Sequence, residues 1–194
     1  MDFDDVIVKR RSIRKFKEDR VPEKVLNKVL DAGRWAPSAG NSQPWRFVVV
    51  TDADVKQGIA KICIEFSRKM WAKFSPERAR YLAARGGSWD KSGIGRIPVL
   101  IVVCYEILER MREELVLVST WCAIENMLLA ATAEGLGSCI YTFYSIKEED
   151  RLKEMLRVPE RYRIAAMIQL GYSAVDPVLP SRKALNEVAS YQHF

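Results

Sequence analysis

One segment constrains the fold more than any other, because it is apolar nearly all the way round a helix. It runs from Leu115 to Ala133 and is followed by Gly135 and Gly137. A helix that is hydrophobic on every side must be covered by other elements, so we expect a central buried helix. Glycine is favoured just after a helix C-terminus, and we expect the two glycines to end this one.

Three short apolar runs predict the buried strands that such a helix can cover. They span 47–50, 98–104 and 164–170, and strands buried on both faces carry continuous apolar runs of this kind. Further helices are expected near 4–10, 23–33, 55–71 and 146–157. The last would begin at a capping box formed by Ser145 and Glu148. Strands and helices alternate, which predicts a layered structure.

The length and composition fit one unit without a linker. The chain has 194 residues, of which 48% are hydrophobic, and shows no repeat or low-complexity run, so we expect a single domain over 1–194. The acidic N-terminus does not resemble a signal peptide. The longest uninterrupted apolar run, 97–104, is too short to cross a bilayer. We therefore expect a cytoplasmic protein without a membrane segment.

Charge and cysteine content exclude two classes of site. The net charge is +6, but the excess gathers near the two chain ends, and no nucleic-acid-binding motif accompanies it. We expect no nucleic-acid partner. Four cysteines without C-x-x-C spacing and a single histidine, His193, argue against a metal site. The cysteines lie among apolar neighbours and are expected to be buried reduced thiols.

The first candidate site is the cluster Arg10-Arg11-Ser12-Ile13-Arg14. The planar guanidinium group suits phosphate oxygens, and a serine hydroxyl can add a short hydrogen bond. A solvated basic helix end is the competing interpretation, because charge runs are common.

The second candidate is the turn-rich stretch from Ala36 to Trp45. Its small residues allow a ligand to approach the backbone closely, and Ser38, Asn41 and Gln43 offer hydrogen bonds. An ordinary helix-to-strand connection explains the same residues. Two weaker candidates are Gly135–Tyr141, which could be only a glycine C-cap, and Pro180–Lys183, which could be only surface charge.

Together these segments resemble the nitroreductase family, in order along almost the whole chain. The matching segments are Arg10–Phe16, Pro37–Trp45, the apolar strand at 97–104, the helix with Glu125–Ala131 running into Gly135–Ser138, Gly171-Tyr172, and Arg182-Lys183. The resemblance implies an α+β fold with a mixed β-sheet flanked by helices. It also implies a homodimer that binds two FMN molecules at its interface, with the C-terminal tail packing on the partner subunit.

The resemblance also assigns roles to individual residues. Arg10, Ser12 and Arg182 would hold the FMN phosphate, with Lys183 beside them and Arg11 helping through its backbone or side chain. Arg14 would lie beside the flavin N1 and O2.

Other segments would contact the ring. Pro37, Ser38, Ala39 and Asn41 would come from the other subunit. Ile140, Tyr141 and Thr142 would lie along the isoalloxazine, with a backbone amide bonding N5. Thr142 departs from the glycine or glutamate of many members, and positions 70–96, often the pocket's lid, diverge here.

The activity implied is that of an FMN-dependent NAD(P)H oxidoreductase. NAD(P)H would give hydride to flavin N5, and a small acceptor such as a nitroaromatic, quinone or flavin would take it by a ping-pong mechanism. Three alternatives within the family are reductive dehalogenation, flavin reduction and flavin fragmentation. A non-enzymatic FMN-binding module is a further alternative.

Overall fold

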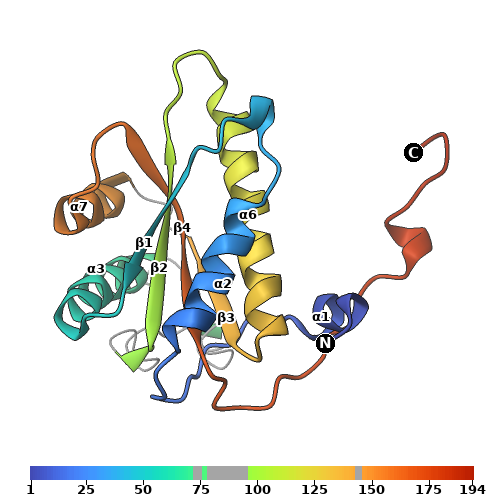
Figure 1. Cartoon of the computed structure of the whole chain (residues 1–194), viewed down its shortest axis with the longest axis horizontal. Coiled ribbons are helices and arrows are strands. Elements are labelled where there is room, and N and C mark those ends of the chain that lie inside the picture. Colours follow the sequence, from blue (N-terminus) through green and yellow to red (C-terminus); the bar gives the residue numbers. More distant parts are fainter. Residues whose placement is uncertain (72–75, 78–95, 143–145) are drawn as a thin grey trace.

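The computed structural model describes residues 1–71, 76–77, 96–142 and 146–194, and its core is a four-stranded sheet covered by helices on both faces (Figure 1). The elements, in chain order, are α1 Phe3–Lys9, α2 Glu23–Arg34, η1 Ala39–Asn41, β1 Trp45–Val50, α3 Ala53–Trp71, β2 Val99–Glu106, α6 Glu113–Ala133, β3 Gly137–Tyr141, α7 Ile146–Leu156, β4 Tyr162–Gly171 and η3 Leu185–Glu187.

The strand order is β1-β2-β4-β3, and every neighbouring pair is antiparallel. The expected α+β class is confirmed. The expectation of a mixed sheet needs correction, because among the described strands none runs parallel to its neighbour. The one parallel pairing in this part of the chain is an isolated bridge between Ser12 and Ser138.

Two hydrophobic layers hold the sheet. On one face, α2 and α6 pack over β2 and β4, with Ile101, Ile168 and Met127 fully buried between them. On the other face, α3 and α7 cover the same strands, with Ile59 and Leu152 at the centre (Figure 1). Because β2 is buried on both faces, its sequence is a continuous apolar run, as predicted.

The predicted central helix is α6. By length and hydropathy alone this helix is also long and apolar enough to cross a bilayer. The prediction of no membrane segment rested only on the longest uninterrupted apolar run, at 97–104, and so did not take this helix into account. In the fold it packs against the sheet and α2, as a core helix does. Its outer face carries the half-buried Cys122, so the expectation of burial is met by the other three cysteines and not by this one.

The end of α6 shows a strand that the sequence interpretation missed. Gly135 has a φ of 77°, and the Leu136 N–H donates to the Ala131 carbonyl at 2.8 Å, the bonding of a glycine-terminated helix. Gly137, expected to help end the helix, is instead the first residue of β3. β3 has only five residues and begins with a glycine, so its sequence shows no periodic pattern that would predict a strand.

Helix starts agree with the predictions to within a few residues. α2 begins directly after Pro22, as expected. α3 begins at Ala53, because the Asp52 carboxylate accepts a hydrogen bond from the Val55 N–H at 2.9 Å. Ser145, the first residue of the proposed capping box, and most of the 70–96 segment lie outside the described residues.

The crossing of α2 and α6 generates a stability prediction. A methyl group on Gly33 would lie 2.8 Å from the fully buried Met127 Cγ and 3.1 Å from the Phe47 ring. Gly33→Ala should therefore lower the free energy of unfolding by about 1–3 kcal/mol, measured by urea denaturation. Gly58→Ala is the matched control, since its methyl would meet only the flexible end of exposed Met155. The control should be neutral or stabilising by up to about 1 kcal/mol. Equal losses in both variants would contradict this account of the packing.

Candidate functional site

The arginine cluster lies along the free edge of β3. α1 ends at Lys9, and the chain then runs beside the first residues of the strand, where the Ile13 N–H donates to the Ser138 carbonyl at 2.8 Å. A Cβ on Gly137 would lie 2.8 Å from Ile13. Glycine is therefore required for this close approach.

The cluster carries positive charge that the described residues neutralise only in part. Arg10 Nε lies 3.6 Å from Glu125 Oε1, and no carboxylate among the described residues pairs with Arg11 or Arg14. The Nε of Arg11 is buried without a hydrogen-bond partner in this part of the chain. Such donors suit an anionic ligand, and a phosphate group in particular.

The charge of the cluster also reaches the strand beside it. Burial raises the pKa of the Cys139 thiol, while the positive charges of Arg14 and Arg10 and a hydrogen bond with Ser12 oppose that rise. The side chains of residues 10–14 therefore gather at the start of β3.

The strand continues from this cluster as an open edge. Among the described strands, β3 pairs only with β4, along one side. The side chain of Ile140 packs with the α2–α6 layer and that of Tyr141 with the α3–α7 layer. What remains at the edge is backbone. Because the Ser138 carbonyl points outward to Ile13, the amide of Ile140 faces the same side. Thr142 follows and is half-buried.

The second predicted stretch runs from Ala36 to Trp45, and its part from Pro37 to Asn41 lies beside the N-terminal end of α6 (Figure 1). Its backbone is unusual, since Gly40, Asn41 and Gln43 all have positive φ, at 56°, 52° and 45°. For glutamine this conformation costs about 1–2 kcal/mol, so the surrounding structure must stabilise it.

Hydrogen bonds within and below the loop do so. Ser38 Oγ accepts from the Gln43 N–H at 3.1 Å, and Gln43 Nε2 donates to Asn41 Oδ1 at 3.2 Å. The Ala39 N–H donates to the buried Ser119 Oγ of α6 at 3.0 Å. Ser119 was not among the predicted residues, and its only sequence signal is a helical spacing of small residues with Ala123.

The C-terminal cluster stands apart. The chain follows the body as far as Ala174, whose N–H donates to the Lys15 carbonyl at 3.0 Å, and then leaves it. Arg182 and Lys183 are exposed on this tail, which runs past α1 (Figure 1). One chain therefore brings residues 10–14 together with 138–142, but not with the loop at 37–41 or with Arg182 and Lys183.

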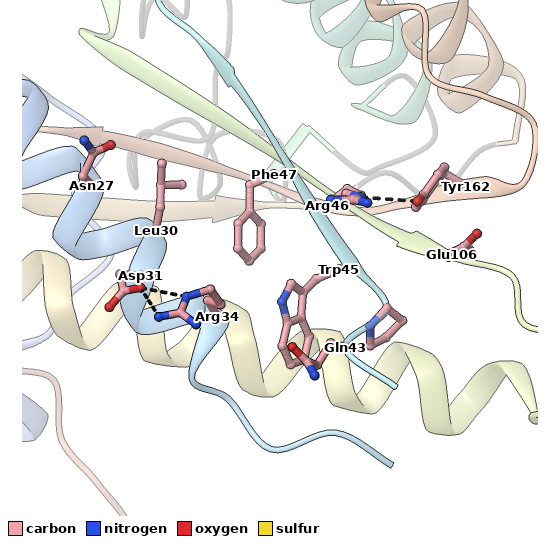
Figure 2. A pocket seen from close by; sticks show the side chains of 11 residues that line it. Asn27, Leu30, Asp31, Arg34, Gln43, Trp45, Arg46, Phe47, Glu106 and Tyr162 are labelled. Carbon is pink, nitrogen blue, oxygen red and sulfur yellow. Dashed lines mark hydrogen bonds and ion pairs between the residues drawn. The ribbon is translucent and has the colours of Figure 1, made fainter. Parts of the chain in front are cut away.

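A separate groove of about 640 Å³ follows the free edge of β1 (Figure 2). Trp45 and Phe47 form its floor, Arg34 and Asp31 of α2 form one wall, and Arg46 bonds Tyr162 Oη at 3.4 Å at its far end. Gln43, Pro44 and Trp45, at the end of the second candidate stretch, line it, whereas the residues assigned to FMN do not. It lies along the edge of β1 that pairs with no other described strand, and it is distinct from the edge of β3.

Comparisons with known proteins agree with the resemblance. A model described as the nitroreductase family matches residues 7–172. An iodotyrosine deiodinase of Thermotoga neapolitana is 29% identical, over 87% of each chain. A nitrobenzene nitroreductase of Ectopseudomonas oleovorans is 26% identical, over 98% of this chain and 97% of the relative. A crystal structure of oxidized iodotyrosine deiodinase bound to FMN and 3-iodo-L-tyrosine superposes with a TM-score of 0.85 and 26% identity over the whole of both chains.

Proposed function

The protein belongs to the nitroreductase family, and we propose that it is an FMN-dependent oxidoreductase that takes hydride from NAD(P)H and passes it to a small acceptor. The observation that carries this proposal is the arginine cluster, Arg10 to Arg14, lying against the free edge of β3. It offers guanidinium groups to a phosphate and backbone amides to a flat ring next to it. The FMN-bound structural neighbour supports the choice of cofactor.

The chain's own residues would bind and orient the cofactor. Arg10 and Ser12 would hold the phosphate, with Arg11 beside them. Arg14 would place its charge by the flavin N1 and O2, and an amide of the segment 140–142 would bond N5. Because Ile140 and Tyr141 turn their side chains into the two core layers, the edge presents backbone to the ring.

The bound FMN supplies the hydride chemistry, with NAD(P)H and a nitroaromatic, quinone or flavin acceptor using one site in turn by a ping-pong mechanism. No side chain need serve as a general base. The single histidine, His193, lies one residue from the chain end and away from the described cluster.

Reductive dehalogenation is the second candidate reaction. It is favoured by relatives named iodotyrosine deiodinase and by the deiodinase structure that matches the full length of this chain. Both reactions use the same cofactor site, so the acceptor distinguishes them.

The test starts from the colour of the purified protein. Heat-released cofactor should be FMN by chromatography, and NADH or NADPH should bleach it rapidly in a stopped-flow experiment. Reoxidation by a nitroaromatic or quinone faster than by 3-iodotyrosine would support the reductase, and the opposite order would support dehalogenation. A protein that takes up FMN but turns over no acceptor would be a binding module. Recovery of FAD, or no uptake of FMN, would contradict the proposal.

We also propose a homodimer, because one chain alone leaves large apolar side chains exposed on two helices. The outer face of α6 exposes Leu115 and Val118, and the neighbouring α1 exposes Phe3 and Ile7. Large apolar side chains exposed on two adjacent helices are typical of an interaction site. The exposed tail after Ala174 would pack on the partner, where the open edge of β1 offers unpaired backbone groups (Figure 2). The partner would then supply the loop Pro37, Ser38, Ala39 and Asn41.

The dimer proposal predicts the effect of a charge on α6. Val118 is 60% exposed in one chain, and Val118→Glu would bury an unpaired carboxylate in the interface. The dissociation constant of the dimer should rise at least about a hundredfold, measured by sedimentation or light scattering at micromolar concentration. Met155→Glu, at 40% exposed on α7 of the opposite layer, is the control and should leave the dimer intact. A wild-type monomer that still holds FMN would sink the idea.

Arg14 and Arg182 should differ in kind. Arg182→Ala removes a charge-assisted bond to phosphate and should weaken FMN binding about ten- to a hundredfold, with little change in midpoint potential. Arg14→Ala removes a cation beside the atoms that gain negative charge on reduction, so it should lower the midpoint potential and slow reduction by NAD(P)H. FMN affinity can be measured by fluorescence titration, and the midpoint potential of bound FMN by redox titration. A potential shifted by Arg182→Ala and unchanged by Arg14→Ala would show that the two roles are reversed.

A further inference from the structure

The cofactor loop at 37–43 rests on one face of α6. Ser119 and Asn126 are seven residues apart, or two helical turns, and therefore share a face. Ser119 Oγ accepts from the Ala39 N–H at 3.0 Å, and Asn126 Nδ2 donates to the Ala32 carbonyl at the end of α2 at 3.1 Å. Between them, Ala123 is fully buried against Ala36 and Trp45. This face of α6 thus contacts the chain before, at and after the loop.

Ser119 makes the bond that reaches the loop itself. Its hydroxyl donates to the Leu115 carbonyl at 2.7 Å, which orients the oxygen to accept from Ala39. The side chain is only 4% exposed, so water cannot readily replace it. The residues that follow Ala39 immediately enter the left-handed region, at Gly40 and Asn41. The hydrogen bond from the Ala39 N–H to Ser119 Oγ therefore holds the backbone directly before the left-handed residues of the turn.

We infer that Ser119 is a positioning residue for FMN binding, which acts by holding the Ala39 amide and hence the shape of the loop that contacts the cofactor. The inference rests on the proposed function. Thr120 provides a contrast within the same helix, because its buried hydroxyl bonds the Val116 carbonyl at 2.9 Å and no loop amide among the described residues. Both hydroxyls donate to the carbonyl four residues earlier in the helix. Of the two, only Ser119 also accepts a hydrogen bond from the loop, from the Ala39 N–H.

The experiment measures FMN affinity by flavin fluorescence during reconstitution of the full-length protein. Ser119→Ala leaves the Ala39 N–H without its partner and should weaken binding about five- to tenfold. Thr120→Val should change it less than about twofold, and Ser119→Thr, which keeps the acceptor, should restore most of the affinity. The midpoint potential of bound FMN should stay at the wild-type value in all three variants, because none changes a charge.

A double-mutant cycle separates positioning from general stability. Ala39→Pro removes the N–H at the first position of η1, where proline is tolerated and where Ser38 is already extended. In that background Ser119→Ala should weaken FMN binding no further. Equal affinities of Ser119→Ala and wild type, or fully additive effects of the two changes, would overturn the inference. A wild-type protein that binds no FMN would instead overturn the proposed function.

Discussion

The burial of α6 is the constraint on which the rest of the structure depends. One side of this helix covers the sheet at Ile101 and Ile168, and another receives α2 through contacts close enough to require Gly33. With two sides occupied, a helix that is apolar all round still has surface to cover. Other parts of its surface contact the loop at 37–43 and α1, so the position of α6 sets where that loop and the start of the arginine cluster lie.

Sheet topology supplies the second half of the site. In the order β1-β2-β4-β3, the two central strands are buried, and the two outer strands each have one edge that pairs with no other strand in the described part of the chain. The Ser12–Ser138 bridge occupies the beginning of the outer edge of β3. It places the arginine cluster beside the following residues of the strand, whose backbone on that edge pairs with no described strand. The groups proposed to bind the phosphate and the flavin ring are therefore adjacent, because the loop at 10–14 pairs with only the beginning of an edge strand. Gly137 permits that pairing by leaving room for Ile13.

The sequence predicts those parts of the fold that burial determines. The central helix follows from its long apolar stretch and the strands β1, β2 and β4 from short continuous apolar runs, whereas FMN follows from the family resemblance that the motifs carry. β3 escaped prediction because its pairing with β4 is long-range and its five residues lack periodicity. Ser119 escaped because a serine in a helix shows no sign of a partner 80 residues away in sequence. Residue types reveal what a segment can bind, whereas the geometry that orients a loop depends on contacts distant in the chain.

The division of the site between separate elements has a physical reason. Three arginines placed together repel one another, and a single partial ion pair to Glu125 does not neutralise them. A bound phosphate would reduce this repulsion, because its negative charge offsets the positive charges of the arginines. The residues that repel one another in the free protein are therefore those that would bind the anion. Arg182 and Lys183 are exposed in the middle of the tail that follows Ala174, and their positive charge would add to that of the cluster only after the tail docks. In the proposed site, phosphate binding and docking of the tail would therefore stabilise each other.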